Sequence, residues 1–189
     1  IASAEACLEL LSAAISLAIT QPDDRGGRWA ITDNLLNRNF QPERPDLVWT
    51  GDITYIATQE GWLYLAVVID LFSRQVVGWA MGKRMTRHLV IDALTMAWFR
   101  RRPAEGLIFH SDQGSQYASG DFQATLRGYA MHGSMSRKGN CWDNAVTETL
   151  FGSLKVERLH GMSFETRRQA QDEVIDWLAF YNQRRMHST

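Results

Sequence analysis

Residues 48–81, VWTGDITYIATQEGWLYLAVVIDLFSRQVVGWAM, hold three β-rich runs in close succession. The first two, Val48 to Ile56 and Trp62 to Ile69, are joined by a short connection that ends in Gly61, which predicts a β-hairpin. The third run, Gln75 to Met81, follows after another short connection. We therefore expect three consecutive antiparallel strands at the start of a sheet.

Helices and strands alternate after this meander. Apolar residues at helical spacing predict a helix that begins after Thr86 and ends near Arg101. A buried strand, a helix, a short strand and two further helices are predicted over Leu107–His110, 121–129, Met131–Met135, 143–160 and 163–181. Because strands that alternate with helices add to a sheet in parallel, the pattern describes an RNase H-like α/β fold, a mixed five-stranded sheet flanked by helices. In that arrangement the first and fourth strands lie side by side.

The composition allows one sizeable core: 45% of the 189 residues are hydrophobic and 22% are charged. We expect residues 1–43 to form an N-terminal leader helix and linker outside the core, and residues 44–189 to form the core itself. The stretch from 1 to 20 is apolar but contains Glu5 and Glu9, which favours an amphipathic helix over a membrane span. Two cysteines without disulfide or zinc spacing favour a reducing, cytoplasmic location.

Three carboxylates stand out: Asp52 in an apolar strand, Asp112 at the end of another, and Glu148 on a helix. A charge in an apolar strand is costly unless it has a binding partner. Taken alone, Asp52 could be satisfied by neighbouring threonine hydroxyls, and Asp112 could close an Asx turn. Their placement on the first strand, the fourth strand and a helix favours a shared metal site instead.

Phosphodiester transfer needs an aligned nucleophile and neutralisation of the negative charge that develops. Two divalent ions about 3.5–4 Å apart meet both needs, and hard oxygen ligands favour Mg²⁺ or Mn²⁺. We therefore expect Asp52, Asp112 and Glu148 to be the catalytic residues and the ligands of two such ions per active site.

The predicted helix around Glu148 has two faces. At about 100° per residue, one line along the helix holds Asn144, Glu148, Gly152 and Lys155. The opposite side is apolar, so a catalytic face and a core face separate. A helix-interior glycine costs about 1 kcal/mol relative to alanine. Gly152 is explained either by DNA that approaches closely or by close helix packing.

The sequence gives less indication of function for the other polar and aromatic residues. We expect Asp70 to be a structural turn residue and His110 to be a packed histidine at a strand end. Tyr117 and Trp142 either stack on an unpaired base or pack in the core or a loop. The net charge of −1 is low for a nucleic-acid-binding protein, although local basic clusters such as 100–102 offset it.

From about Asn34 onward the chain resembles the integrase-core transposases of bacterial insertion sequences, especially those of the IS-three family. The strings that carry the resemblance are NLLNRNF, WTGDITYI, GWLYLAVVIDLFSRQVVGWAM, HSDQGSQY, RKGNCWDNAVTETLFGSLKVE and WLAFYNQRRMH. The resemblance implies a retroviral-integrase core over 44–189 and a DDE triad of Asp52, Asp112 and Glu148. It also implies DNA contacts, for which the candidates are Asn140, Asn144, Lys155, Arg137, Lys138 and Arg158.

The expected function is therefore metal-dependent DNA cleavage and strand transfer during transposition. The resemblance implies transposon ends and target DNA as partners and a homo-oligomer on DNA, with no membrane and no small-molecule substrate, in a bacterial cytoplasm where the bound protein is nucleoid-associated. The alternative is a relic that binds DNA or partner subunits without catalysis. A nuclease for RNA–DNA hybrids on the same fold is disfavoured by the helix-borne Glu148 with Lys155 behind it.

Overall fold

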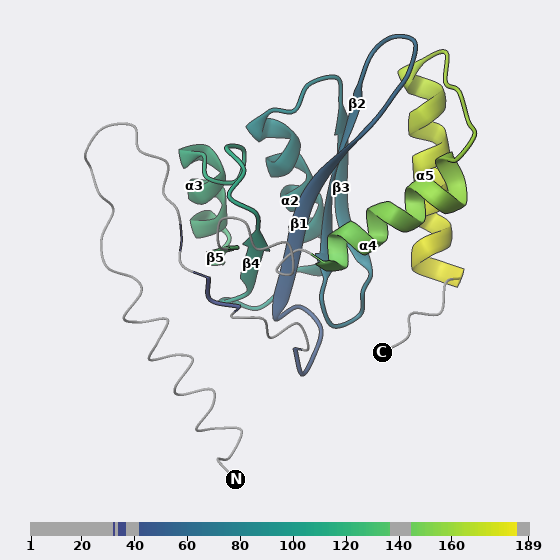
Figure 1. Cartoon of the computed structure of the whole chain (residues 1–189). Helices are drawn as coiled ribbons and strands as arrows, with labels where there is room; N and C mark the ends of the chain where they lie inside the picture. The colour runs from purple at the N-terminus through teal and green to yellow at the C-terminus, as the bar shows by residue number, and fades with distance from the viewer. Residues whose placement is uncertain (1–31, 33, 37–41, 137–144, 185–189) are drawn as a thin grey trace.

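The computed structural model describes residues 32, 34–36, 42–136 and 145–184, which form a mixed sheet covered by helices on both faces (Figure 1). Five strands are hydrogen-bonded in the order β3-β2-β1-β4-β5. Their bounds are Val48–Ile56 for β1, Leu63–Asp70 for β2, Val76–Gly82 for β3, Ile108–Ser111 for β4 and His132–Met135 for β5. The predicted RNase H-like five-stranded sheet is confirmed.

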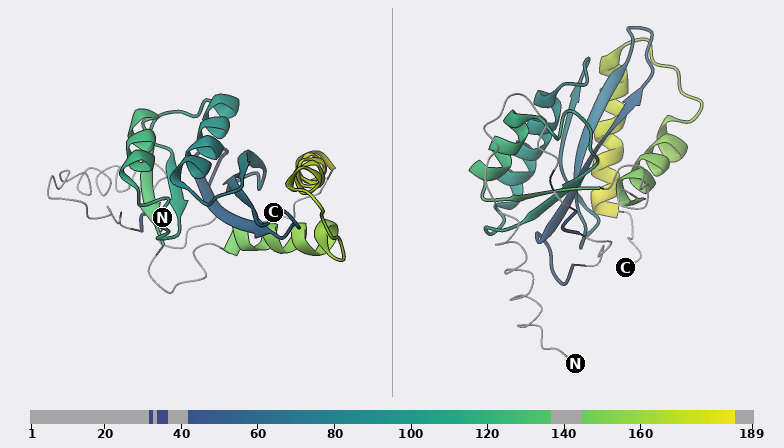
Figure 2. Two further views of the ribbon diagram at one scale, coloured as in Figure 1. Left: turned by 90° about the horizontal axis from the view of Figure 1, so that it is seen from above. Right: turned by 60° about the vertical axis from the view of Figure 1, so that its left-hand side comes forward.

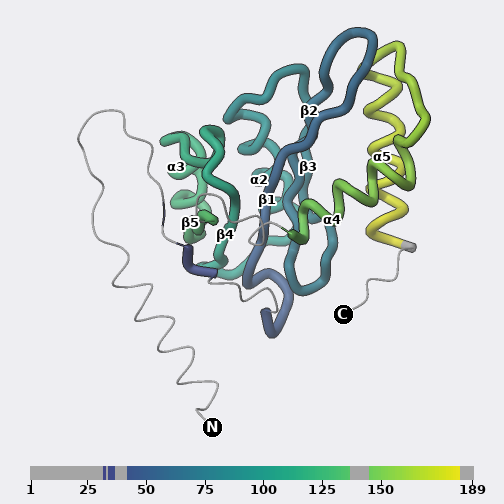
Figure 3. The backbone as a smooth tube through the Cα atoms, viewed as in Figure 1, coloured from purple at the N-terminus to yellow at the C-terminus, as the bar shows by residue number. Residues whose placement is uncertain are grey.

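Pairing within the sheet follows the expected mixture. β1 pairs with β2, and β2 with β3, in antiparallel register, whereas β1–β4 and β4–β5 are parallel. The first and fourth strands are thus neighbours, and the backbone trace shows β1 beside β4 near the middle of the sheet (Figure 3).

Helices α2 (Arg87–Arg101) and α3 (Gly120–Gly128) lie on one side of the sheet, and α4 (Ala145–Leu154) lies on the other (Figure 2). Two apolar clusters match these layers. One joins Trp49 and Phe109 to α2 and α3, and the other joins Val67 and Leu150 to α5 (Arg167–Arg184). The period of two along β1 assigns Trp49 and Asp52 to opposite faces, so Asp52 belongs to the face that α4 covers.

Gly78 on β3 explains how closely α2 approaches the sheet. A Cβ atom at this position would lie 2.7 Å from the backbone nitrogen of Ala97 and would also collide with the carbonyl oxygen of Ala93. Both obstacles belong to the α2 backbone, which no side-chain rotation can move. The glycine therefore sets the distance between helix and strand.

Two helix bounds differ from the prediction. The last helix begins at Arg167 rather than at 163, because Thr166 and Gln169 form a capping box: the Thr166 hydroxyl accepts from the Gln169 N–H (3.2 Å), and the Gln169 side chain accepts from the Thr166 N–H (3.2 Å). The helix predicted to end at 160 changes after Leu154 into a π-helical turn, η2 (Lys155–Leu159).

A short segment of the predicted leader packs on the core. Leu36 is buried against Val48 and Leu71, and the Leu35 N–H donates to the Ser134 hydroxyl at 3.0 Å. The division at 43/44 stays a prediction, since most of the leader lies outside the described residues. Within the part of the chain that the structure describes, no helix is long and apolar enough to cross a membrane.

Candidate active site

The pairing of β1 with β4 places Asp52 and Asp112 next to each other. Thr50 lies opposite His110 in this parallel ladder. Asp52 comes two residues after Thr50 on β1, and Asp112 comes two residues after His110, directly beyond the end of β4 at Ser111. The two aspartates therefore occupy equivalent positions on the same face, on neighbouring chains that run about 4.8 Å apart where paired. Both residues are half-buried.

Each aspartate has one oxygen bound to a backbone N–H. Oδ1 of Asp52 accepts from the Ile53 N–H at 2.7 Å, and Oδ1 of Asp112 accepts from the Gly114 N–H at 2.9 Å. The second contact is the Asx turn that was one interpretation of Asp112. Because the turn uses a single oxygen, it orients the carboxylate and leaves Oδ2 available as a ligand.

Tyr117 is a buried residue whose hydroxyl is affected by the charges of both aspartates. Its side chain is buried among Phe109 and Phe122. Burial raises the pKa of the Tyr117 hydroxyl well above its ordinary value, and the negative charges of Asp52 and Asp112 raise this pKa further. Because its side chain is buried, Tyr117 is a core residue rather than a base-stacking one.

Glu148 lies on α4 with its side chain exposed. The predicted division of this helix is confirmed over the described residues: Gly152 and Lys155 are exposed, whereas Leu150 and Leu154 are buried. Among the described residues no three His, Cys, Asp or Glu side chains are close enough to hold one metal ion. The structure thus brings Asp52 and Asp112 together and leaves Glu148 on the helix that covers their face.

The candidate DNA contacts have different surroundings. Lys155 is exposed, and its ammonium lies 5.5 Å from the ring centre of Tyr55. Arg158 forms an ion pair with Glu173 at 2.6 Å and a weaker one with Asp176 at 4.0 Å, which ties η2 to α5. Outside the described residues lie Arg137, Lys138, Asn140 and Asn144, as does the possible stacking residue Trp142.

Asp70 and His110 have structural roles, as predicted. Asp70 is fully buried and accepts from the Asp46 N–H (3.0 Å), the Ser73 N–H (3.0 Å) and the Ser73 hydroxyl (2.6 Å), so it fixes the turn after β2. His110 is also fully buried, with Nδ1 2.9 Å from the Ser134 hydroxyl oxygen.

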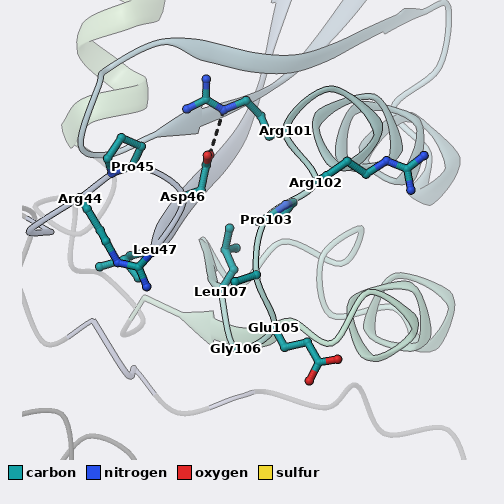
Figure 4. A pocket seen from close by; sticks show the side chains of 11 residues that line it. Arg44, Pro45, Asp46, Leu47, Arg101, Arg102, Pro103, Glu105, Gly106 and Leu107 are labelled. Atoms are coloured by element: carbon teal, nitrogen blue, oxygen red, sulfur yellow. Dashed lines mark hydrogen bonds and ion pairs between the residues drawn. The ribbon is translucent and has the colours of Figure 1, made fainter.

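A hollow at the opposite end of β1 and β4 was not predicted (Figure 4). It lies beside Leu47 and Leu107, which precede the two strands, whereas Asp52 lies in the middle of β1 and Asp112 follows the end of β4. Arg101 crosses it to reach Oδ1 of Asp46 at 3.0 Å. The hollow contains none of the predicted site residues, so it is not the candidate active site.

The fold and the adjacent aspartates on its first and fourth strands define an RNase H-like domain of the retroviral-integrase type. Comparison with known proteins agrees. The chain belongs to the integrase core domain family, whose pattern matches residues 42–141, and a second integrase core domain pattern matches residues 129–189.

Relatives and solved structures support this assignment. The chain is 50% identical over 159 residues to the transposase InsF for insertion sequence IS3A of Escherichia coli (84% of this chain, 55% of the relative), so it spans little more than half of that relative's length. It is 48% identical over 166 residues to the transposase for IS904 of Lactococcus lactis (87% of this chain, 66% of the relative).

Two retroviral structures share the fold at low sequence identity. A chain of the simian T-cell lymphotropic virus intasome superposes with a TM-score of 0.65 at 20% identity, covering 99% of this chain and 63% of the other. The catalytic core of HTLV-2 integrase, solved in complex with magnesium, gives a TM-score of 0.58 at 20% identity, covering 77% of this chain and 92% of the other.

Proposed function

We propose that this chain is the catalytic core of a DDE transposase, which cuts DNA at the ends of an insertion sequence and joins the freed ends to target DNA. The observation that carries the proposal is the position of Asp52 and Asp112, each two residues beyond the paired residues Thr50 and His110 of the parallel strands β1 and β4. The kinship with insertion-sequence transposases supports the same substrate.

The site fits a divalent cation. Two half-buried carboxylates on adjacent strands place negative charge close to a buried tyrosine hydroxyl, and a cation bound between them would compensate that charge. Asp52 and Asp112 would hold it, with Glu148 completing the ligand set when α4 and DNA are engaged. Oxygen ligands of this kind select Mg²⁺ or Mn²⁺, and two ions per site is our proposal. The magnesium in the HTLV-2 core supports the use of a divalent ion.

The chemistry consists of two displacements at phosphorus. In the first, water attacks a phosphodiester, a P–O bond forms to the water oxygen, and the bond to the 3′-oxygen breaks to leave a 3′-hydroxyl. In the second, that hydroxyl attacks a target phosphodiester and the target's own 3′-oxygen leaves with a proton. Bound divalent ions would stabilise the charge that develops on the attacking and leaving oxygens. The three carboxylates would hold these ions in place. No covalent protein intermediate is needed.

Catalysis is tested on a branched DNA in which a 3′-hydroxyl already abuts the phosphodiester. Such a substrate supplies the alignment that end recognition by a longer protein would provide. In Mn²⁺ or Mg²⁺ we expect this chain to catalyse attack of that 3′-hydroxyl on the phosphodiester, which resolves the branch. This activity should be lost when EDTA is added. A chain that binds the branched DNA but leaves it intact at every metal concentration would be a non-catalytic relic, and the proposal would fail.

Metal binding is expected even without DNA. At 100 times its dissociation constant, an ion that binds only the folded state raises the free energy of unfolding by about 2.7 kcal/mol. Thermal unfolding in Mn²⁺ should therefore occur several degrees higher than in EDTA, and Asp52→Asn should remove the difference. An equal shift in the Asp52→Asn protein would mean that the ion binds elsewhere.

A further inference from the structure

A short segment that precedes the predicted core wraps around the edge of the sheet. β5 is an edge strand, and successive residues of a strand point to opposite faces. A Cβ added at Gly133 would point toward α3 and lie 3.4 Å from the Thr32 hydroxyl oxygen. On the other face, the Leu35 N–H donates to the Ser134 hydroxyl at 3.0 Å. We call residues 32 and 34–36 the strap, part of which is the short purple segment beside β5 in Figure 1.

The strap reaches β4 through the Ser134 hydroxyl. Its oxygen accepts from the Leu35 N–H and lies 2.9 Å from Nδ1 of His110. The side chains of Ser134 and His110 are both fully buried. One hydroxyl therefore joins the strap to β5 and to β4, two residues before Asp112.

β5 also holds the backbone on both sides of Asp112. The Ser111 carbonyl oxygen accepts from the Ser136 N–H at 2.9 Å, and the Gln113 side chain donates to the Ser136 carbonyl oxygen at 3.0 Å. Ser136 is two residues after Ser134, which the strap holds. A shift of β5 would therefore move both neighbours of Asp112.

The next residue of the strap faces the helix that carries Glu148. Leu36 is 5% exposed and forms a buried cluster with Val48 and Leu71. Val146, in the first turn of α4, packs against this cluster and lies two residues before Glu148. Truncation of Leu36 would leave a cavity in the cluster that supports this turn.

We propose that the strap positions two carboxylates of the metal site: Leu35 holds β5 and β4, and thereby Asp112, while Leu36 holds the first turn of α4, and thereby Glu148. The inference rests on the proposed function. Leu35 and Leu36 are positioning residues, because they act through β5 and α4 and not by contact with metal or DNA. Groups that orient metal ligands typically contribute 10–100-fold to metal affinity or activity. Release of the strap would loosen the site while the sheet stays paired.

The mechanical part of the proposal is tested with Leu36→Ala and the control Leu89→Ala. Leu89 is also 5% exposed, but it lies on α2 in the apolar cluster of the other sheet face. Both substitutions should lower the melting temperature to a similar extent. In EDTA, amide hydrogen exchange over residues 108–112 and 145–150 should become faster in Leu36→Ala only. Equal exchange of these segments in the two variants would overturn the proposal.

The Leu35 anchor is tested by metal binding without DNA. Ser134→Ala removes the hydroxyl that joins Leu35 to His110 and leaves every carboxylate in place. We expect this variant to bind Mn²⁺ about tenfold more weakly than the wild type, measured from the paramagnetic resonance signal of the free ion. Leu89→Ala should bind Mn²⁺ as tightly as the wild type. Wild-type affinity in Ser134→Ala would contradict the assignment.

The Leu36 anchor is tested by the rate of branch resolution. At saturating Mn²⁺ and DNA we expect Leu36→Ala to react about tenfold more slowly, with unchanged affinity for branched DNA in EDTA. Leu36→Met nearly conserves the volume of the side chain and should restore most of the rate. A rate loss of the same size in Leu89→Ala would make the effect one of stability alone and refute the positioning role. If Leu36→Ala does not fold at the assay temperature, Ser134→Ala decides the proposal.

The wild-type chain separates the two levels of inference. If it does not resolve the branch with any metal, the proposed function fails, while hydrogen exchange and Mn²⁺ binding still test the strap. If it resolves the branch and both Leu36→Ala and Ser134→Ala match Leu89→Ala in exchange, Mn²⁺ affinity and rate, the function stands and the strap fails.

Discussion

Replacement of Asp52 or Asp112 by asparagine should reduce branch resolution by about 10³-fold or more. Each change preserves the size of the side chain and removes one of the two adjacent charges, so the divalent ions lose a ligand whose contribution to the transition state is several kcal/mol. The measurement is the single-turnover rate at saturating Mn²⁺, compared with the same substitution at the exposed Asp172 on α5. Asp172→Asn should react at the wild-type rate.

Loss of activity must be separated from loss of fold. Asp52 and Asp112 are like charges at equivalent positions of neighbouring strands, so removal of either one relieves repulsion. In EDTA we expect Asp52→Asn and Asp112→Asn to melt at or above the wild-type temperature. A lower melting temperature together with activity above one tenth of wild type would assign the residue a structural role and contradict the ligand assignment.

Glu148→Gln extends the comparison to the helix. The side chain is exposed on α4, so the substitution should leave the melting temperature in EDTA unchanged while it abolishes resolution of the branch. Activity near the wild-type value would remove Glu148 from the ligand set and leave the two aspartates alone as metal ligands.

Gly78→Ala is expected to have the largest effect on stability. The added methyl group would collide with the carbonyl oxygen of Ala93 and lie 2.7 Å from the Ala97 nitrogen, so α2 must move away from β3. We expect a loss of about 3 kcal/mol or more in the free energy of unfolding, or about 6–12 °C in melting temperature. Urea unfolding measures it, with Gly128→Ala as a control that should be slightly stabilised. A neutral Gly78→Ala would mean that helix and strand can separate at little cost.

Strand order and the faces of α4 could be predicted from sequence because each depends on local periodicity. The three β-rich runs before the first helix fix the antiparallel part, and alternation of helix with strand fixes the parallel part. The start of α5 differs from the prediction although the sequence carries a signal for it: Thr166 followed by Gln169 is a capping pattern. The π-helical turn after Leu154 has no comparable local signal.

The candidate site could be predicted in part. Asp52 and Asp112 follow from strand order, because neighbouring parallel strands bring equivalent positions together. The Asx turn and the metal-site interpretations of Asp112 proved compatible, since the turn uses one oxygen only. The buried position of Tyr117 could not be predicted, because which aromatic rings are buried depends on packing between distant segments.

The parallel ladder between β1 and β4 also makes the candidate site depend on segments that are far apart along the chain. During synthesis the first strand leaves the ribosome long before the fourth, and the helix with Glu148 emerges later still. A growing chain or an early-terminated product therefore holds Asp52 without Asp112 and Glu148. Assembly of the candidate site is coupled to translation of nearly the whole described domain.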